Sequence, residues 1–283
     1  MNGIHTALVT PFAADGAVDL ATFEALCARQ LQAGIHGLVP CGTTGETPAL
    51  TPEEWASLTR VAVEVAGGNV PVTVGVGTNV TASTVENCRA AKALGADQGL
   101  MVLPYYNKPN PRGHVAHLRA AAAVGLPLVV YHVPGRTGQR VDASLLALLA
   151  SQQGVVAVKE ATGDLRCGTE VIAATATPVL SGDDFSFLGL LAQGGAGCVS
   201  VVSNVAPEKT VAIYDHFRAG RVDHARGVLL ELWELIAFLF SETNPVPCKA
   251  AMAALGLCAA TTRLPLATWD EPLPETMVRR ALA

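Results

Sequence analysis

Lys159 stands at the end of an uninterrupted apolar run, residues 155–158, and a polar turn that contains a glycine follows it. A run of this kind is typical of a strand that is covered on both faces. Partial burial at the end of such a strand favours the neutral amine of a lysine, which is the form that attacks a carbonyl to give a Schiff base. The alternative is a lysine that caps its strand and pairs with Glu160, because structural ion pairs also place lysines at strand ends.

A turn with two hydroxyl groups, Gly42-Thr43-Thr44-Gly45, is the second candidate site. Exposed backbone N–H groups in such a turn bind anions, and the hydroxyls of Thr43 and Thr44 suit a carboxylate. The sequence contains neither a GxGxxG nor a GxxxxGK[ST] motif, which disfavours a nucleotide. An ordinary turn between a strand and a helix is the alternative. Glu46 follows, and we expect it to hold the turn.

Three further side chains could act on a substrate. Tyr131 ends the predicted strand before that of Lys159, and neighbouring strands lie about 4.8 Å apart, so its phenol could shuttle protons to an adduct on the lysine. Arg136 lies in a Pro-Gly loop, and its planar fork suits a second carboxylate. Tyr105 and Tyr106 form an aromatic pair of the kind found at interfaces. A core tyrosine and a surface ion pair are the alternatives for Tyr131 and Arg136.

The bulk composition excludes several classes of partner. The chain has 283 residues, of which 19 are basic and 24 acidic, for a net charge of −5. This balance predicts no nucleic-acid partner and no anionic membrane surface. The apolar runs fall short of the roughly 18 residues of a membrane span. Residues 1–10 lack the pattern of a signal peptide, so we expect none.

Cysteine and histidine usage predicts a cytoplasmic chain without a metal. The seven cysteines are scattered and form no CxxC pair, which is typical of reduced thiols in the cytoplasm. Cys41 adjoins the Gly-rich turn, and a small buried filler is favoured there over a reactive thiol. His114 and His117 are three residues apart, but no further ligand has a usable spacing.

Apolar segments of strand and helix type alternate along residues 1–221. The predicted strands are residues 6–10, 37–40, 70–76, 98–103, 128–132, 155–159, 178–181 and 198–202. Eight parallel strands, each followed by a helix, predict an α/β fold, the TIM (β/α)8 barrel. Residues 222–283 differ, with helical patterns at 224–240, 245–255 and 275–282. They predict a C-terminal helical extension packed on the barrel.

The chemistry of such a barrel lies at the C-terminal ends of its strands. The polar and aromatic residues collect there, whereas the opposite loops carry mostly glycines that end helices. These strand ends are residues 10–11, 41–46, 75–79, 104–107, 131–138, 159–160, 181–184 and 200–204. The asymmetry favours the catalytic interpretation of Lys159.

Four blocks of sequence carry a resemblance to a known family. They are GTTGE at 42–46, PYYN at 104–107, YHVPGRTG at 131–138 and VKEATGD at 158–164, with SGDD at 181–184 and NPVPCKAAM at 244–252 in addition. Together they resemble the dihydrodipicolinate synthase / N-acetylneuraminate lyase superfamily, which comprises class I pyruvate-dependent lyases and synthases on a TIM barrel. The resemblance covers essentially the whole chain.

The resemblance implies catalytic roles. Lys159 would form the Schiff base with pyruvate. Tyr131, Thr43 and Tyr106 would relay protons, with Tyr106 supplied by a neighbouring subunit of a homotetramer, a dimer of dimers. No external cofactor is expected, because the lysine imine is itself the electron sink.

The resemblance also implies substrate-binding roles. Thr44, helped by the strand-end backbone at Gly182 and Val199, would hold the pyruvate carboxylate. Arg136 would hold the carboxylate of a short aldehyde.

Within the superfamily the pattern is similar to that of the synthases, in which the aldehyde is aspartate 4-semialdehyde and the product 4-hydroxy-tetrahydrodipicolinate, on the route to diaminopimelate and lysine. The Thr43-Thr44 pair and Arg136 carry this preference, because sialic acid lyases typically have Ser-Thr and lack the arginine. Two alternatives stay open. One is a related aldolase or dehydratase acting on a sugar acid or a hydroxyproline-derived substrate. The other is a non-catalytic barrel that binds a 2-oxo acid.

Two departures from the family pattern have consequences. His132 stands where synthases commonly carry Asn, and we expect it beside the site, where it could alter aldehyde preference. Trp55 and Ser83 stand where the lysine-feedback site often has His or Lys and Glu. They predict weak or absent inhibition by lysine.

Overall fold

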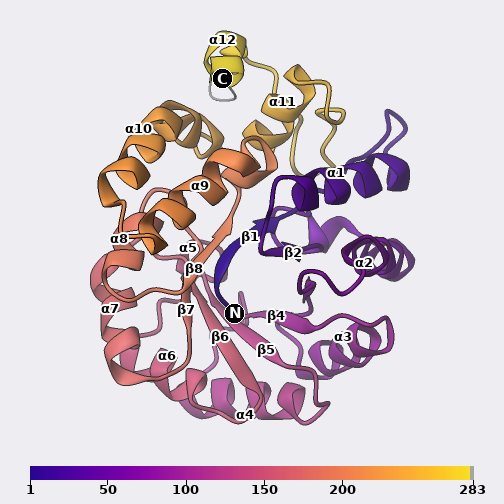
Figure 1. The fold of residues 1–283 in the computed structure, drawn as a ribbon. Helices are drawn as coiled ribbons and strands as arrows, with labels where there is room; N and C mark the ends of the chain where they lie inside the picture. Colours follow the sequence, from indigo (N-terminus) through magenta and orange to yellow (C-terminus); the bar gives the residue numbers. More distant parts are fainter. Residues whose placement is uncertain (281–283) are drawn as a thin grey trace.

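Eight parallel strands form a closed barrel in the computed structural model, which describes residues 1–280 (Figure 1). The strands are β1 (Gly3–Ala7), β2 (Gly37–Val39), β3 (Thr73–Gly75), β4 (Gln98–Val102), β5 (Leu128–His132), β6 (Val155–Glu160), β7 (Val179–Ser181) and β8 (Gly197–Ser200). Their order is β2-β1-β8-β7-β6-β5-β4-β3, and a parallel bridge between Leu38 and Val72 closes the ring. The predicted TIM barrel is confirmed.

Helices surround the strands as an outer ring (Figure 1). They are α1 (Leu20–Gln32), α2 (Pro52–Ala66), α3 (Thr81–Ala93), α4 (Pro111–Ala122), α6 (Ala143–Ala150), α7 (Leu165–Ala174), α8 (Phe187–Ala192) and α9 (Pro207–Arg218). Local sequence explains where they begin: Asp19 caps α1, and Thr51 forms a capping box with Glu54 on α2. The short helix α5 (Pro134–Thr137), which the sequence did not predict, lies in the loop after β5.

The first strand lies nearer the N-terminus than predicted. The sequence pattern indicates residues 6–10, whereas β1 is Gly3–Ala7. Asn204 accounts for the end of the strand, because its side chain donates to the Ala7 carbonyl at 2.8 Å and accepts the Val9 N–H at 3.2 Å. The chain therefore leaves the sheet after Ala7 and becomes a loop at the C-terminal rim.

Two apolar layers form the core. The inner layer fills the barrel and contains Ala7, Val39, Leu100, Val129, Tyr131, Ala157, Leu180 and Val199. The larger outer layer lies between strands and helices. Successive side chains of a strand point to opposite faces, so Tyr131 in the inner layer means that His132 points to the outer one.

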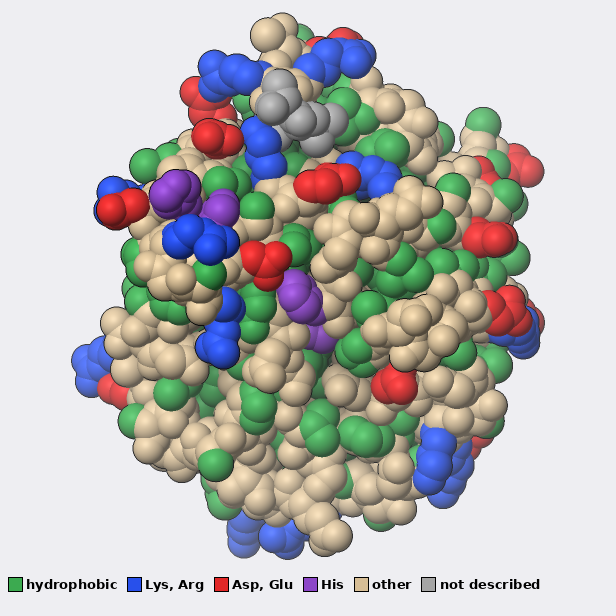
Figure 2. Space-filling view, in the orientation of Figure 1, with side chains coloured by type: hydrophobic (Ala, Val, Ile, Leu, Met, Phe, Trp, Pro, Cys, Tyr) green, Lys and Arg blue, Asp and Glu red, His purple; other side chains and the backbone are tan. Residues whose placement is uncertain are grey.

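The C-terminal extension consists of α10 (Val222–Leu239), α11 (Val246–Ala254) and α12 (Glu275–Arg280). Helix α10 packs along α9 and contacts α11 (Figure 1). Of the helix predicted for 275–282, residues 281 and 282 lie outside the described part of the chain. No helix within residues 1–280 is long and apolar enough to cross a membrane. Figure 2 shows acidic and basic side chains interspersed on one face of the molecule, without a continuous basic surface.

Candidate active site

Lys159 and Tyr131 meet inside the C-terminal end of the barrel. The two residues are register partners on β6 and β5, and the Lys159 Nζ lies 4.1 Å from the centroid of the tyrosine ring. Each is 5% exposed. The alternative pair between Lys159 and Glu160 does not form, because Glu160 lies on the opposite face of β6 and accepts the Thr162 N–H at 2.9 Å. The lysine is thus left to face the barrel interior.

Gly182 makes room for the stem of Lys159. A Cβ atom at this position would lie 2.7 Å from the Lys159 Cε and 2.6 Å from the Ala161 Cβ, both far inside van der Waals contact. The Gly182 N–H donates to the Glu160 carbonyl at 2.6 Å, which fixes the backbone beside β6. Val199, the other predicted backbone contact, is the second-last residue of β8 and is buried in the inner layer. Both residues therefore line the same end of the barrel as the lysine.

The turn Gly42-Thr43-Thr44-Gly45 follows β2 at the same rim. The N–H of Gly45 donates to the Gly42 carbonyl, and that of Glu46 to the Thr43 carbonyl, each at 3.1 Å. Thr44 is buried and Thr43 half-buried. The structure thus brings a closed, hydroxyl-bearing turn to the end of the barrel that holds Lys159.

Asn244 joins the two predicted carboxylate-binding residues. Its Nδ2 donates to the Thr44 Oγ1 at 2.9 Å, and its backbone carbonyl accepts from Arg136 Nη2, also at 2.9 Å. Arg136 is exposed on α5, at the mouth of the site. Asn244 is a site residue that the sequence does not predict; its only signal is its place in the NPVPCKAAM block.

Tyr106 is not brought to the other site residues within one chain. Its side chain is 87% exposed, and its backbone is left-handed, with φ of 67°. Such a conformation is uncommon for a residue other than glycine and persists only where the surroundings impose it. The Tyr106 N–H donates to the Thr137 carbonyl at 3.3 Å, which ties the loop to α5.

Two neighbours of the site are not part of it. His132 is fully buried in the outer layer, and burial lowers its pKa to about 4. The expectation that it lies beside the site is wrong, because it follows the inward-facing Tyr131 in a strand and therefore points to the outer layer. Cys41 is also buried, and burial raises the pKa of its thiol to about 12. A thiol in this state is a poor nucleophile at neutral pH, which agrees with a filler.

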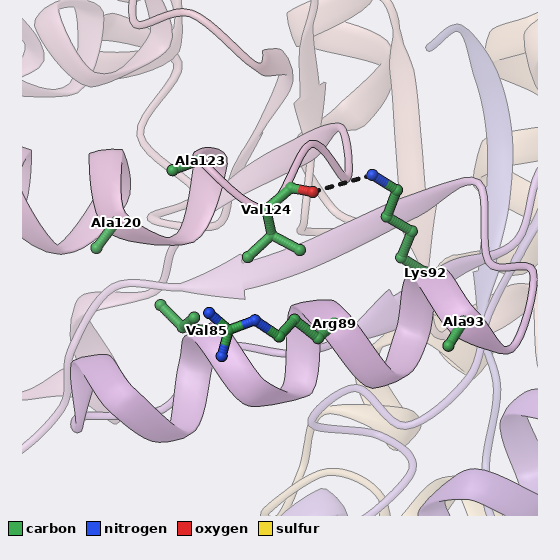
Figure 3. Close-up of a pocket in the computed structure, with 7 residues that line it drawn as sticks. All are labelled: Val85, Arg89, Lys92, Ala93, Ala120, Ala123 and Val124. Atoms are coloured by element: carbon green, nitrogen blue, oxygen red, sulfur yellow. Dashed lines mark hydrogen bonds between the residues drawn. The ribbon is translucent and has the colours of Figure 1, made fainter.

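A groove of about 540 Å³ lies elsewhere, on the outer surface between α3 and α4 (Figure 3). Arg89 and Lys92 line it together with small apolar side chains, and Lys92 Nζ donates to the Val124 carbonyl at 3.0 Å. None of the predicted catalytic residues reaches it. Within residues 1–280, no group of three or more His, Cys, Asp or Glu residues is placed to hold a metal ion.

The fold and the site define a (β/α)8-barrel protein with a buried lysine and a tyrosine paired at the strand ends. The chain belongs to the dihydrodipicolinate synthetase family, whose model matches residues 1–281. A relative named 4-hydroxy-tetrahydrodipicolinate synthase from Methanoculleus marisnigri is 43% identical over 280 residues, 97% of this chain and 96% of the relative.

Solved structures give the same result. The chloride-inhibited dihydrodipicolinate synthase from Acinetobacter baumannii, complexed with pyruvate, is 36% identical with a TM-score of 0.94, covering 99% of this chain and 97% of that one. A monomeric variant of dihydrodipicolinate synthase is 38% identical with a TM-score of 0.95, covering 100% of this chain and 96% of that one.

Proposed function

We propose that this protein is a lyase, a 4-hydroxy-tetrahydrodipicolinate synthase, which condenses pyruvate with L-aspartate 4-semialdehyde in the first committed step towards diaminopimelate and lysine. The observation that carries the proposal is the pair of Lys159 and Tyr131 inside the barrel, with the Nζ 4.1 Å from the ring centroid. Membership of the family and full-length relatives of that name support it. The pyruvate bound by the Acinetobacter baumannii protein supports pyruvate as the first substrate.

The reaction would begin at the Lys159 amine. The amine adds to the ketone of pyruvate, and loss of water gives an imine. Loss of a methyl proton converts the imine to an enamine, whose carbon forms a bond to the aldehyde carbon of the second substrate. The amine of that substrate then attacks the imine carbon, which closes the ring and releases Lys159. The imine is the electron sink, so we propose that no external cofactor takes part.

The other residues would move protons and hold carboxylates. Tyr131 is next to the lysine and would pass protons to and from the adduct, with Thr43 and a Tyr106 hydroxyl completing the relay. The turn at Thr44 would hold the pyruvate carboxylate through its hydroxyl and backbone N–H groups, as in other anion-binding turns. Arg136 at the mouth would hold the carboxylate of the aldehyde.

Assembly and location are further parts of the proposal. Tyr106 is exposed in a single chain, which supports a role in the site of a partner subunit in a homotetramer. The monomeric variant among the solved structures means that assembly must be measured. All seven cysteines are free, which supports a reducing, cytoplasmic setting.

Trapping of the imine tests the proposal. We expect that borohydride reduction in the presence of pyruvate adds one pyruvate-sized mass to the peptide that holds Lys159, and that Lys159→Ala abolishes the adduct. A coupled assay with aspartate 4-semialdehyde then tests the second substrate. A folded wild-type protein without an adduct would remove the Schiff-base mechanism; an adduct without turnover of this aldehyde would point to another aldolase of the superfamily.

We also expect weak or absent inhibition by lysine. Trp55 is largely buried and its indole N–H donates to the Gly75 carbonyl at 2.9 Å, so this position offers no polar group to a ligand. Ser83 is exposed but carries no charge for an ammonium group. Activity measured with lysine up to the low millimolar range should stay near that of the untreated enzyme. Inhibition at sub-millimolar lysine would contradict the prediction.

A further inference from the structure

A buried ion pair connects the GTTGE turn to the C-terminal extension. The Lys249 Nζ, on α11, lies 2.5 Å from the Glu46 Oε1, and the two side chains are 0% and 1% exposed. The second carboxylate oxygen of Glu46 accepts the backbone N–H of Arg263 at 2.9 Å. Lys249 also donates to the Thr261 carbonyl at 2.8 Å. Both oxygens of one carboxylate are thus held by the extension.

An aromatic ring completes this cluster. Phe12 is buried, with the Lys249 Nζ 4.1 Å and the Arg263 guanidinium carbon 4.4 Å from its ring centroid. Both distances are typical of cation–π contacts. Arg263 continues outward to Glu54 at the start of α2. The loop after β1, the loop after β2 and the extension therefore meet at one point behind the turn.

Glu46 lies at the end of the Thr43-Thr44 turn, and its backbone conformation affects that of the turn. It follows Thr43, Thr44 and Gly45 directly, and its backbone is left-handed, with φ of 53°. A non-glycine residue keeps this conformation only where its surroundings hold it. Its N–H donates to the Thr43 carbonyl at 3.1 Å, so a rotation of Glu46 would move the carbonyl and amide groups of both threonines.

Stability alone does not account for the pair. Removing two charges from water is costly, and buried ion pairs are often replaceable by apolar residues of similar size without loss of stability. Burial lowers the pKa of Lys249, although Glu46 opposes this shift. The pair has another consequence, which is that it fixes the backbone of a substrate-binding turn from outside the barrel.

We propose that Lys249 and Glu46 are positioning residues, which act through the Thr43-Thr44 turn to set the affinity of the site for the pyruvate carboxylate. The inference rests on the proposed function, because it assumes that this turn binds that carboxylate. It assigns to the extension a part in substrate binding that acts through the Thr43-Thr44 turn.

Four proteins test the inference: wild type, Lys249→Met, the double variant Lys249→Met/Glu46→Gln, and Met252→Ala. Met252 lies on the same helix, is buried in the outer core and serves as the control for lost packing. Two quantities are measured for each, the melting temperature and the pyruvate concentration that gives half-maximal borohydride trapping on Lys159. The trapping needs no aldehyde, and steady-state kinetics then divide the effect between KM and kcat.

Lys249→Met should raise half-saturation and the KM for pyruvate about tenfold, with kcat changed about threefold or less, since loss of ground-state binding raises KM. The double variant leaves no charge unpaired, so its melting temperature should recover, while its KM for pyruvate stays raised because the turn still lacks its connection to Lys249. Met252→Ala should lower the melting temperature and leave half-saturation unchanged.

The outcomes separate this inference from the proposed function. A wild-type protein without an adduct overturns both. An adduct whose half-saturation is unchanged in the variants overturns the positioning role alone, and so does a KM that recovers together with the melting temperature in the double variant. If Lys249→Met does not fold, the double variant decides by the same criteria.

Discussion

The environment of Lys159 is set by which neighbours approach its side chain. Tyr131 lies against its Nζ, and Gly182 leaves space for its methylene stem. Because Gly182 has no side chain, its backbone can lie beside β6 without displacing the lysine. The site therefore requires the space beside Gly182 as specifically as it requires the lysine amine.

Gly182→Ala should reduce activity more than stability. The added methyl would overlap the Lys159 Cε and the Ala161 Cβ, and a displacement of about 1 Å at a reacting group costs on the order of 10²-fold in rate. Overpacking should cost about 1–3 kcal/mol of stability. The measurements are kcat, adduct formation with pyruvate and urea unfolding.

Gly227→Ala is the matched control, since nothing lies within 4 Å of a methyl group there. It should leave activity unchanged. A Gly182→Ala enzyme with normal kcat would show that the lysine does not need its observed path.

The buried His132 should lower the free energy of unfolding in acid. Burial lowers its pKa to about 4, with Arg140 and His114 as lesser causes, from an ordinary value of 6.5. As the pH falls, His132 is therefore protonated in the unfolded chain at a higher pH than in the folded protein. Its contribution to the free energy of unfolding is complete above pH 6.5 and is lost as the pH falls towards 4. Between pH 7.5 and 5.5 this group alone should cost about 1 kcal/mol.

His132→Asn should remove that part of the acid sensitivity, and urea unfolding at the two pH values measures it. The exposed His224→Asn serves as the control and should behave as the wild type. An equal loss for wild type and His132→Asn would contradict the assignment.

At the scale of elements, the segment between α10 and α11 reaches the active site directly. Asn244 in this segment contacts the turn after β2 and the short helix after β5. The segment thereby fixes the spacing between the two groups proposed to hold the substrate carboxylates. The extension is in this respect part of the barrel's functional rim.

Asn244→Ala should weaken pyruvate binding. It removes the hydrogen bond to the Thr44 Oγ1 and keeps the backbone carbonyl that accepts from Arg136. A typical hydrogen bond contributes about 1 kcal/mol, which corresponds to about a fivefold rise in the KM for pyruvate. The KM for the aldehyde should change less, and the exposed Glu242→Ala should change neither. An unchanged pyruvate KM in Asn244→Ala would sink the prediction.

The sequence predicts elements that local patterns encode. The apolar runs and helix caps indicate the barrel, and the register of β5 and β6 brings Tyr131 beside Lys159 as expected. The orientation of His132 was also encoded, because neighbours in a strand point to opposite faces. The expectation failed because a residue next to Tyr131 in sequence lies on the other face of β5.

Contacts between distant segments were beyond the sequence. Asn244 and Thr44 are 200 positions apart, and no periodicity or turn pattern links them. The ion pair of Glu46 and Lys249 could not be predicted for the same reason, since no sequence pattern indicates which distant residue pairs with a lysine in an apolar helix. Glu46 was expected to hold its turn, but not to be held by the extension.

At the scale of the whole molecule, Tyr106 is a large aromatic side chain left in solvent on a left-handed backbone. The Tyr106 N–H donates to the Thr137 carbonyl, which holds this backbone against α5 and leaves the phenol in solvent. The exposed side chain supports the proposal that Tyr106 acts in the active site of a partner subunit.

Complementation between two impaired variants tests whether Tyr106 acts in the site of a partner subunit. Tyr106→Phe and Lys159→Ala should each be strongly impaired, the first by about 10²-fold or more, because loss of a proton-transfer group has effects of this size. Mixing the two under conditions of subunit exchange should restore part of the activity, since one site then has both residues. Each variant treated alone gives the baseline. No gain on mixing, with mixed oligomers present, would show that Tyr106 does not act across subunits.

The link between Glu46 and the extension also bears on biosynthesis. The partners of Glu46 follow it by 203 and 217 positions. A nascent chain on the ribosome can form most of the barrel before Lys249 and Arg263, the partners of Glu46 in the turn after β2, have been synthesised. Full affinity for the substrate should therefore arise only when translation is nearly finished, so that shortened products that fold extensively would bind the substrate weakly.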